Sequence, residues 1–222
     1  MDGLRARAAG LNGMRLDRLR FTGPGTDLEV GLLPLSRFAC ASGPSGSGNV
    51  FIMNMPTEEV YTTPDVRRAS GTVRCTRPVR VMGVDVEAAR FVFADGAVVR
   101  ADADRGADAL CRYLDIDAQA RRLGEVSLVD AASPVARAGR VFHSILIDEN
   151  AACHVALGGG CPDAIEGGLS MSEKELEALG CNTSLVHTDF MIGSDEVSVD
   201  GITADGDVRP VIRGGRFVPV GT

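Results

Sequence analysis

The chain contains three histidines, His143, His154 and His187, and the segment around the last of them has the clearest pattern for chemistry. In TSLVHTDFMI (residues 183–192) the β-prone flanks predict a strand. The two-residue period of a strand places His187 and Asp189 on one face. Imidazole and carboxylate are both metal-ligand types. The sequence therefore predicts a pair of metal ligands on this strand.

Glu149 and His154 form a second candidate pair of ligands. The segment DENAACHVALG (residues 148–158) predicts a helix that Asp148 caps and that a glycine ends. On an ideal helix with about 3.6 residues per turn, side chains five positions apart diverge by roughly 140°. Glu149 would therefore have to act from the frayed first turn.

Further carboxylates lie in apolar or turn-forming surroundings. Glu125 lies in the β-prone run LGEVSLV (residues 123–129). Glu58 and Glu59 follow the turn-forming MPT (residues 55–57). A carboxylate buried in such a run needs a partner, and a metal cation is one. The alternative is that Glu59 and Glu125 are solvated or paired with arginine, and each residue taken singly favours that alternative.

The elements that must position these residues begin with a helix and a strand. An amphipathic surface helix is predicted at the N-terminus from apolar residues at roughly helical spacing, namely Leu4, Ala8, Leu11 and Leu19. A turn-forming cluster at residues 21–27 precedes a predicted strand at residues 28–35. Residues 43–48 predict a flexible loop, because a phosphate-binding loop of the Walker type would need a lysine there.

The later part of the chain mixes helices with short strands. The pair Asp95-Gly96 within residues 90–99 predicts a tight hairpin. Helices are predicted at residues 106–123 and 172–179, the second with a capping box that starts at Ser172. An antiparallel tail is predicted from three further turn signals, Asp200-Gly201, Asp205-Gly206 and Gly214-Gly215. Because the order is not strictly βαβ, we predict one α+β domain with a mixed, largely antiparallel sheet and flanking helices.

The composition excludes several classes of protein. A chain of 222 residues with 45% hydrophobic residues is long and apolar enough to bury a sizeable core. The net charge of −7 and the lack of a basic run argue against a nucleic-acid partner. No run approaches the ~20 apolar residues of a membrane span. The six scattered cysteines predict reduced thiols and a cytoplasmic location.

Four segments, in chain order, resemble motifs of the M29 aminopeptidase family. The first, NMPTEEVYTTPD (residues 54–65), resembles the signature NLPTEEVFTAP. The other three are RLGEV (residues 122–126), DENAACHVALG (residues 148–158) and SLVHTDFMIG (residues 184–193). RFTGPGTDL (residues 20–28) and VDGITADG (residues 199–206) are similar to family blocks too. The resemblance covers nearly the whole chain.

Carried over by motif, the resemblance implies a dinuclear centre of Zn, Co or Mn that activates a hydroxide for attack on a peptide carbonyl. The implied activity is removal of N-terminal residues from peptides. The implied metal ligands are Glu59, Glu125, His154, His187 and Asp189, with Glu125 bridging the ions and Glu149 a further ligand. Glu58 and Glu149 are the two candidates for the general base, and the sequence does not choose between them.

Two positions depart from the family pattern. Cys161 stands where the family carries a tyrosine that contacts the metal centre. We expect the Cys161 side chain near the centre, with a gap beside it and a lost phenol donor, although a thiolate could instead bind zinc. His143 replaces a residue that is usually aromatic, and we interpret it as a core histidine.

The resemblance also implies that a separate N-terminal domain precedes this region in relatives. Residues 1–222 are therefore interpreted as the catalytic domain without that domain, with an exposed apolar surface beside the N-terminal helix. The expected partners are peptide substrates, and whether the chain forms a homodimer stays open. One alternative is a truncated, non-catalytic relic or interaction module that retains the metal site. Another is a dinuclear phosphoester hydrolase, which would usually add arginine or lysine at the phosphate site.

Overall fold

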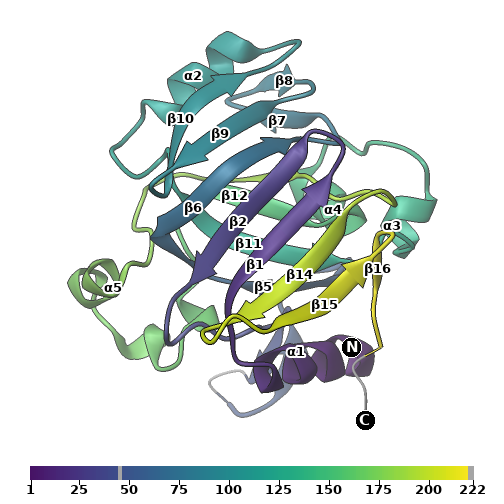
Figure 1. The fold of residues 1–222 in the computed structure, drawn as a ribbon, viewed down its shortest axis with the longest axis vertical. Coiled ribbons are helices and arrows are strands. Elements are labelled where there is room, and N and C mark those ends of the chain that lie inside the picture. Colours follow the sequence, from purple (N-terminus) through teal and green to yellow (C-terminus); the bar gives the residue numbers. More distant parts are fainter. Residues whose placement is uncertain (45–46, 220–222) are drawn as a thin grey trace.

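The structure is a computed structural model that describes residues 1–44 and 47–219 (Figure 1). Two antiparallel sheets form its framework. The larger has the strand order β10-β9-β6-β2-β1-β14-β15-β16 and the smaller the order β13-β12-β11-β5. Five helices and three 3-10 turns accompany the sheets in the described residues. The predicted α+β class with largely antiparallel sheets is therefore confirmed.

The larger sheet consists of β1 (Leu16–Gly23), β2 (Thr26–Leu32), β6 (Pro64–Arg74), β9 (Arg90–Ala94), β10 (Ala97–Asp102), β14 (Ser198–Thr203), β15 (Val208–Arg213) and β16 (Arg216–Phe217). The smaller sheet consists of β5 (Glu59–Thr62), β11 (Leu123–Val129), β12 (His154–Gly158) and β13 (His187–Met191). Two small hairpins are formed by β3 (Ser42–Pro44) with β4 (Val50–Ile52) and by β7 (Val79–Val81) with β8 (Val84–Val86). The helices are α1 (Asp2–Gly13), α2 (Ala107–Leu114), α3 (Pro134–Arg137), α4 (Ile145–Asp148) and α5 (Glu173–Leu179), and the 3-10 turns are η1 (Glu149–Ala151), η2 (Pro162–Ala164) and η3 (Gly168–Ser170).

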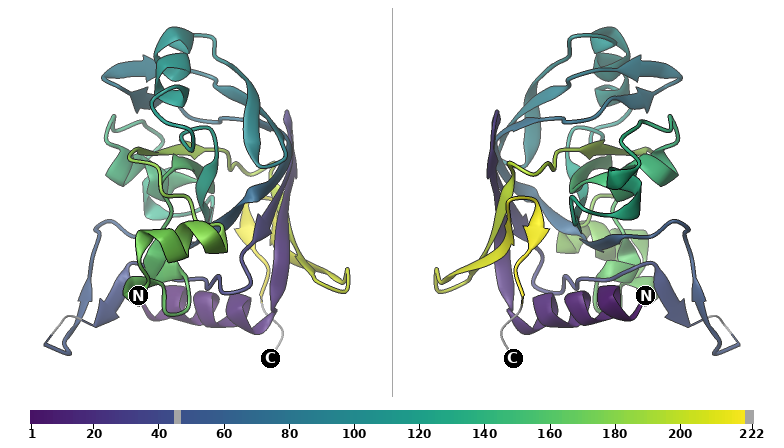
Figure 2. Two further views of the ribbon diagram at one scale, coloured as in Figure 1. Left: turned by 90° about the vertical axis from the view of Figure 1, so that its left-hand side faces the viewer. Right: turned by 90° about the vertical axis from the view of Figure 1, so that its right-hand side faces the viewer.

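The main core lies between the two sheets, which Figure 2 shows with the larger sheet along one side of the molecule. Phe91 on β9 meets Phe190 on β13 edge to face, with ring centroids 5.0 Å apart. Such a pair adds roughly 0.5–1.5 kcal/mol to the hydrophobic burial of the rings. Leu19 and Phe21 of β1 are fully buried in the same core. The smaller sheet thus has one face in the core, and its other face is available for polar side chains.

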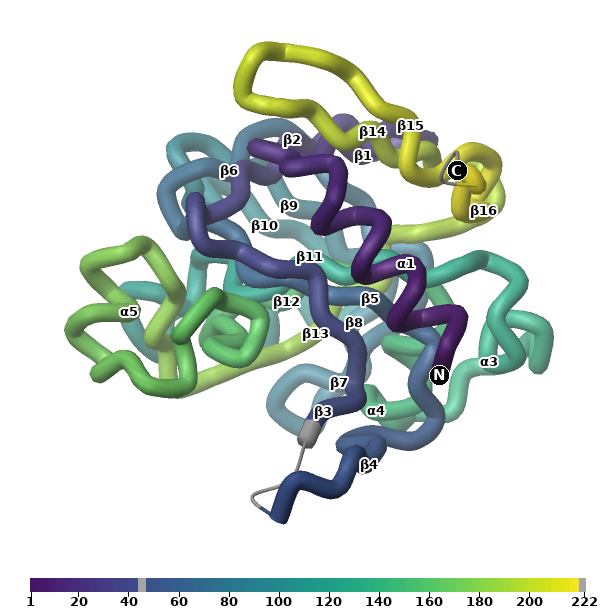
Figure 3. Tube along the Cα trace, turned by 90° about the horizontal axis from the view of Figure 1, so that it is seen from below, coloured from purple at the N-terminus to yellow at the C-terminus, as the bar shows by residue number. Residues whose placement is uncertain are grey.

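The N-terminal helix is shorter than predicted. Helix α1 buries Leu4, Ala8 and Leu11 and lies across the end of the molecule that faces the viewer in Figure 3. The chain leaves the helix through Arg15, whose positive φ of 51° reverses its direction. Leu19, which was expected on the same helix, lies instead in β1.

The prediction of a helix over residues 106–123 was wrong in its second half. Helix α2 ends at Leu114, because Asp117 draws the following backbone into a turn. The Asp117 side chain accepts hydrogen bonds from the backbone of Gln119 and from the hydroxyl of Ser184. Local helical spacing could not reveal this contact with a segment far along the chain.

Several local predictions are confirmed. Ser172 caps α5 with a complete capping box, and Asp95-Gly96 forms the β9–β10 turn with φ of 49° and 80°. The tail is antiparallel, as predicted. Asp200-Gly201 was wrongly taken as a turn, since it lies within β14. A Cβ on Gly201 would come within 2.5 Å of Leu16, so this glycine serves close packing.

The β3–β4 hairpin projects from the body of the molecule (Figure 2). Its apolar side chains that are exposed to solvent are Val50, Phe51, Ile52, Met53 and Met55. Arg5 of α1 donates a hydrogen bond to Ser42 at the base of the hairpin. The exposed apolar surface predicted beside the N-terminal helix, and its role as a docking surface, stay predictions. Of the loop predicted at residues 43–48, residues 45–46 lie outside the described residues.

No helix in the described part of the chain is long and apolar enough to cross a membrane. All six cysteines are free.

Candidate metal centre

One face of the smaller sheet gathers the predicted ligands. Glu59 comes from β5, Glu125 from β11, His154 from β12, and His187 and Asp189 from β13. Strand pairing aligns Glu125 with Ala156 and Ala156 with Asp189. Directly paired residues in an antiparallel sheet project to the same side, so these side chains converge.

These side chains form two groups that share Glu125. Glu59, Glu125 and His154 offer ligand atoms that all lie within 4.8 Å of one another, and so do Glu125, His187 and Asp189. We call them the inner triad and the outer triad. The inner triad is buried, whereas the His187 side chain of the outer triad is 37% exposed. The structure therefore brings all five residues together, and their role as ligands remains a prediction.

The shortest contacts connect each imidazole to a carboxylate of its own triad. His154 Nε2 lies 3.1 Å from Glu59 Oε2 and 3.5 Å from Glu125 Oε1. His187 Nε2 lies 3.2 Å from Asp189 Oδ1 and 3.6 Å from Glu125 Oε2. The two oxygens of Glu125 thus face different triads, as a bridging carboxylate requires.

The predicted helix over residues 148–158 was wrong, and the correction explains how His154 reaches the centre. Only Ile145–Asp148 and Glu149–Ala151 are helical, and His154 begins strand β12. The run HVALG is apolar and contains a β-branched residue, which suits a strand buried on both faces. The angle between side chains on an ideal helix therefore does not apply to Glu149 and His154.

Ala156 leaves room in the middle of the site. It is fully buried and lies on the central strand, directly between Glu125 and Asp189. Strands two apart in a sheet are separated by about 9.6 Å, twice the usual spacing of about 4.8 Å. A methyl group is the only side chain between the two carboxylates, so ions can lie above it.

Backbone carbonyls fix the orientation of both imidazoles. His154 Nδ1 donates to the carbonyl of Ala152 at 3.1 Å, and His187 Nδ1 donates to the carbonyl of Gly159 at 2.7 Å. A carbonyl can only accept, so the proton of the neutral ring lies on Nδ1 and Nε2 keeps its lone pair. This arrangement is common in histidines that bind metals.

Two side chains, Ser127 and Cys161, donate hydrogen bonds to the carboxylates of the centre. Ser127 donates to Glu59 Oε2 at 2.7 Å. It is two residues after Glu125 on β11, and this spacing could have identified it as a residue of the same face. The Cys161 thiol donates to Glu125 Oε2 at 3.0 Å. Cys161 therefore lies beside the centre, as expected from its position in the motif, but belongs to neither triad.

The negative charges of the carboxylates at the centre are not balanced by arginine or lysine in the described chain. No lysine or arginine of the described residues forms an ion pair with Glu59, Glu125 or Asp189, and their only such partners are His154 and His187. The alternative that Glu59 and Glu125 pair with arginine is thus excluded within the described chain. Carboxylate and imidazole donors suit Zn, Co or Mn. The residues present therefore fit two divalent ions.

Burial and mutual repulsion alter the acidity of these groups. Burial, with repulsion from Asp189 and Glu59, raises the pKa of Glu125 despite the opposing effect of His154. Burial lowers the pKa of His187, but the hydrogen bond and charge of Asp189 outweigh it and raise the pKa to about 9. Burial, and then the charge of Glu125, also raise the pKa of the Cys161 thiol well above its usual value.

Glu149 lies next to the centre but outside both triads. It accepts hydrogen bonds from Asn54 Nδ2 at 2.9 Å and from Asn150 Nδ2 at 3.4 Å. Burial, and then the charge of Glu59, raise its pKa to about 7. Glu58 is half-buried, and its backbone N–H donates to Asn150 Oδ1. The structure therefore distinguishes the two candidate bases by their surroundings.

His143 was interpreted as a core histidine, and this was wrong. It is exposed in the segment before α4, with a positive φ of 57°. It belongs to neither triad. The neighbouring Asp148 instead accepts hydrogen bonds from the backbone of Phe142 and Ser144, which folds this segment back on itself.

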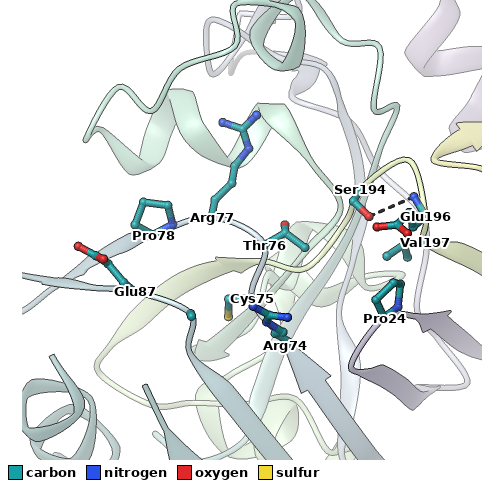
Figure 4. Close-up of a pocket in the computed structure, with 11 residues that line it drawn as sticks. Pro24, Arg74, Cys75, Thr76, Arg77, Pro78, Glu87, Ser194, Glu196 and Val197 are labelled. Atoms are coloured by element: carbon teal, nitrogen blue, oxygen red, sulfur yellow. Dashed lines mark hydrogen bonds between the residues drawn. The ribbon is translucent and has the colours of Figure 1, made fainter. Parts of the chain in front are cut away.

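A separate cavity of about 370 Å³ lies near the start of β7 (Figure 4). Its lining includes Arg74, Arg77 and Glu87 but none of the predicted ligands. Figure 4 shows the Arg77 side chain pointing away from Arg74, and Arg77 donates to the carbonyl of Arg140. The two guanidinium groups therefore do not converge on one anion.

Comparison with known proteins agrees with the resemblance found in the motifs. A family profile described as thermophilic metalloprotease (M29) matches residues 1–217. Aminopeptidase PepS from Streptococcus thermophilus is 42% identical over 98% of this chain and 52% of its own length. Aminopeptidase T from Thermus aquaticus is 44% identical over 97% of this chain and 52% of its own length. The chain belongs to the M29 metalloprotease family.

Two solved structures are similar to the chain in fold. Wild-type AmpT from Thermus thermophilus superimposes with a TM-score of 0.91 at 41% identity, over 98% of this chain and 55% of that one. A 2,5-dihydroxypyridine dioxygenase from Pseudomonas putida shares the fold alone, with a TM-score of 0.62 at 11% identity. The chain spans about half the length of the curated relatives it matches.

Proposed function

We propose that this chain is a metal-dependent aminopeptidase that removes N-terminal residues from peptides through a water activated by two divalent ions. The observation that carries the proposal is the pair of triads that share Glu125, each with an imidazole whose Nε2 faces the carboxylates of its own triad. Family membership supports the reaction, since the relatives named above are aminopeptidases. Residues 1–222 then constitute the metal-binding catalytic domain.

The roles of the side chains follow from their positions. The inner triad would hold one ion, the outer triad the other, and Glu125 would bridge them. Bound there, the two ions polarise the scissile carbonyl and lower the pKa of a water molecule. Ser127 keeps Glu59 oriented, and the carbonyls of Ala152 and Gly159 keep the imidazoles oriented. Oriented ligands lose little freedom on binding, which favours a defined centre.

We assign the general base to Glu149 rather than to Glu58. Glu149 is buried beside Glu59, and its raised pKa suits proton transfer near neutral pH. Its hydrogen bond from Asn54 holds one carboxylate oxygen and leaves the other to take a proton. Neighbouring side chains of an extended chain point to opposite sides, so Glu58 and Glu59 are not expected to face the same ion. Glu149 can serve as a further ligand if an ion moves towards it.

Two other functions compete with this proposal. A non-catalytic relic or interaction module would keep the triads without turnover. A phosphoester hydrolase would need cations for the phosphate, and among the described residues no arginine or lysine forms an ion pair with the ligand carboxylates. Membership of a family of aminopeptidases favours a peptide substrate over a phosphoester.

Metal analysis together with turnover of leucine p-nitroanilide tests the proposal. We expect two equivalents of metal per chain and turnover that rises when cobalt is added. The Glu125→Gln variant should lose both ions and at least ~100-fold in kcat/KM, because it removes the shared ligand. Two bound ions without turnover would favour the module, and cleavage of p-nitrophenyl phosphate instead would favour the phosphoesterase.

Three finer points are also proposals, which rest in turn on the donor set, on the scattered cysteines and on the family resemblance. The native ions are Zn, Co or Mn, the chain works in the cytoplasm, and it forms a homodimer as family members do. Elemental analysis of protein purified without added metal, cell fractionation and light scattering would test them in turn.

A further inference from the structure

The metal centre has one edge that solvent reaches. The exposed fraction of the side chain is 37% for His187 but 1% for His154. Residues 159–163 follow the His187 edge, since His187 donates to the carbonyl of Gly159 and Cys161 donates to Glu125. A peptide that reaches the centre from this edge passes this segment, which we call the rim.

Hydrogen bonds fix the rim to β5 and to the residue that follows it. The backbone N–H of Cys161 donates to Thr63 Oγ1 at 2.9 Å, and the Thr63 hydroxyl donates to the carbonyl of Cys161 at 2.8 Å. The Tyr61 hydroxyl donates to the Asp163 carboxylate. Tyr61 is two residues after Glu59 on β5 and shares its face. Its ring thus connects the face that carries the ligands with the rim.

Asp163 is a carboxylate of the rim that can accept a further hydrogen bond. Its Oδ2 accepts the hydrogen bond from Tyr61, and its Oδ1 has no hydrogen-bond partner among the described residues. No arginine, lysine or histidine of the described chain forms an ion pair with it, whereas the neighbouring Glu166 pairs with Arg37. Its Cα is at most about 7.6 Å from that of Cys161, since consecutive Cα atoms are about 3.8 Å apart. Asp163 is therefore close to the outer triad, exposed, and free to accept a cation.

The other carboxylates of the centre are not available in this way. Glu59, Glu125 and Asp189 belong to the triads, and Glu149 is buried and accepts from Asn54. An aminopeptidase must distinguish a free α-ammonium group from an amide nitrogen. A carboxylate accepts a charge-assisted hydrogen bond from the ammonium group and gains nothing comparable from an amide. A carboxylate of this kind within reach of the scissile bond would provide that distinction.

We propose that Asp163 binds the α-ammonium group of the substrate and that Tyr61 is the positioning residue that holds Asp163 in place. The proposal rests on the aminopeptidase function proposed above and names the residue that selects for a free N-terminus. A hydrogen bond between charged groups can discriminate by roughly tenfold to a hundredfold. This is the size of the expected preference for an α-amine over its absence.

A pair of inhibitors isolates the contribution of the amine. Leucine hydroxamate and 4-methylpentanohydroxamic acid carry the same metal-binding group and side chain, but only the first has an α-amine. Calorimetric dissociation constants on the metal-loaded chain give their ratio. We expect the wild-type chain to favour leucine hydroxamate about tenfold or more, and Asp163→Asn to reduce this ratio to about threefold or less, with two ions still bound. Tyr61→Phe should give an intermediate ratio.

The neighbouring carboxylate supplies the matched control. Glu166→Gln removes an exposed carboxylate three residues from Asp163 that already pairs with Arg37, and it should leave the ratio unchanged. An unchanged ratio in Asp163→Asn, a loss of metal from that variant, a wild-type ratio near one, or no binding of leucine hydroxamate would overturn the proposal. An unchanged ratio in Tyr61→Phe would overturn the role of Tyr61. Turnover of leucine p-nitroanilide by the wild-type chain separately decides the aminopeptidase function.

Discussion

The inner and outer triads share one carboxylate, yet they differ in their surroundings. In the inner triad His154 is 1% exposed and Ser127 supports Glu59. In the outer triad His187 is 37% exposed and the rim lies beside it. A buried site excludes water and strengthens electrostatic contacts, whereas an open site lets a substrate approach. The comparison suggests that the inner triad fixes the centre and the outer triad meets the substrate.

Removing each histidine in turn should show the difference between the two triads most clearly. In metal-free protein, His154→Ala leaves Glu59 and Glu125 buried without their partner, so unfolding should cost about 3–5 kcal/mol less. His187→Ala should cost less than that, because its side chain is partly solvated, although it too leaves a buried carboxylate, that of Asp189, without its nearest partner. Urea denaturation in the presence of a chelator measures both. Equal losses would show that the two triads do not differ in this way.

Filling the space between the carboxylates should prevent metal binding. Ala156→Leu places a large side chain between Glu125 and Asp189, so we expect fewer than half of the wild-type equivalents of metal. It should also destabilise the fold by about 1–3 kcal/mol through overpacking. Ala156→Gly is the matched variant, and it should keep both ions. Full metal content in Ala156→Leu would show that the ions do not lie above this residue.

Removing the hydrogen bond from Ser127 to Glu59 should weaken metal binding at the inner triad alone. Ser127→Ala deletes the hydrogen bond to Glu59 Oε2, and loss of such a contact lowers metal affinity by about 10–100-fold. Competition with a chelator should therefore show one weakened ion and one unchanged ion. If both ions weakened equally, Ser127 would act on the whole sheet rather than on one triad.

The smallest expected effect is on the stability at acid pH, and it comes from the ion pair between Asp17 and Arg68 on the larger sheet. The Arg68 hydrogen bond lowers the pKa of Asp17 below its ordinary 3.8, with Arg18 adding to the effect and burial opposing it. A lowered folded pKa means that the stabilisation is present above about pH 4 and is lost as the pH falls through the folded value. Asp17→Asn should thus remove about 1 kcal/mol or less at neutral pH and flatten the acid limb of the stability curve. An unchanged pH dependence would show that the pair contributes nothing.

Local sequence patterns correctly predicted those features of the fold that depend only on neighbouring residues. The capping box at Ser172 and the turn at Asp95-Gly96 depend on neighbouring residues, and both are confirmed. The helix over residues 106–123 was too long because Asp117 contacts Ser184, which no local pattern reveals. Helical and strand preferences also overlap in the short apolar run after Glu149. Strand pairing with β11 and β13 decided that this run forms β12.

The residues of the candidate site could be predicted where a strand pattern or a family motif contained them. The period of two placed His187 and Asp189 on one face, and the family motifs identified the remaining predicted ligands. The rim could not be predicted, because the bond between Tyr61 and Asp163 joins residues that are 102 positions apart. The space above Ala156 likewise depends on the register of three strands. Such features arise from tertiary pairing, and sequence spacing does not report it.

The central claim is that Glu125 bridges two ions, one in each triad. A crystal structure of the metal-loaded chain, with anomalous diffraction at the metal edge, tests it most directly. We expect two anomalous peaks about 3.5–4 Å apart, as in other two-metal hydrolases. One Glu125 oxygen should contact each ion, with His154 bound to the inner ion and His187 to the outer one. A single peak, or two peaks of which Glu125 contacts only one, would contradict the account.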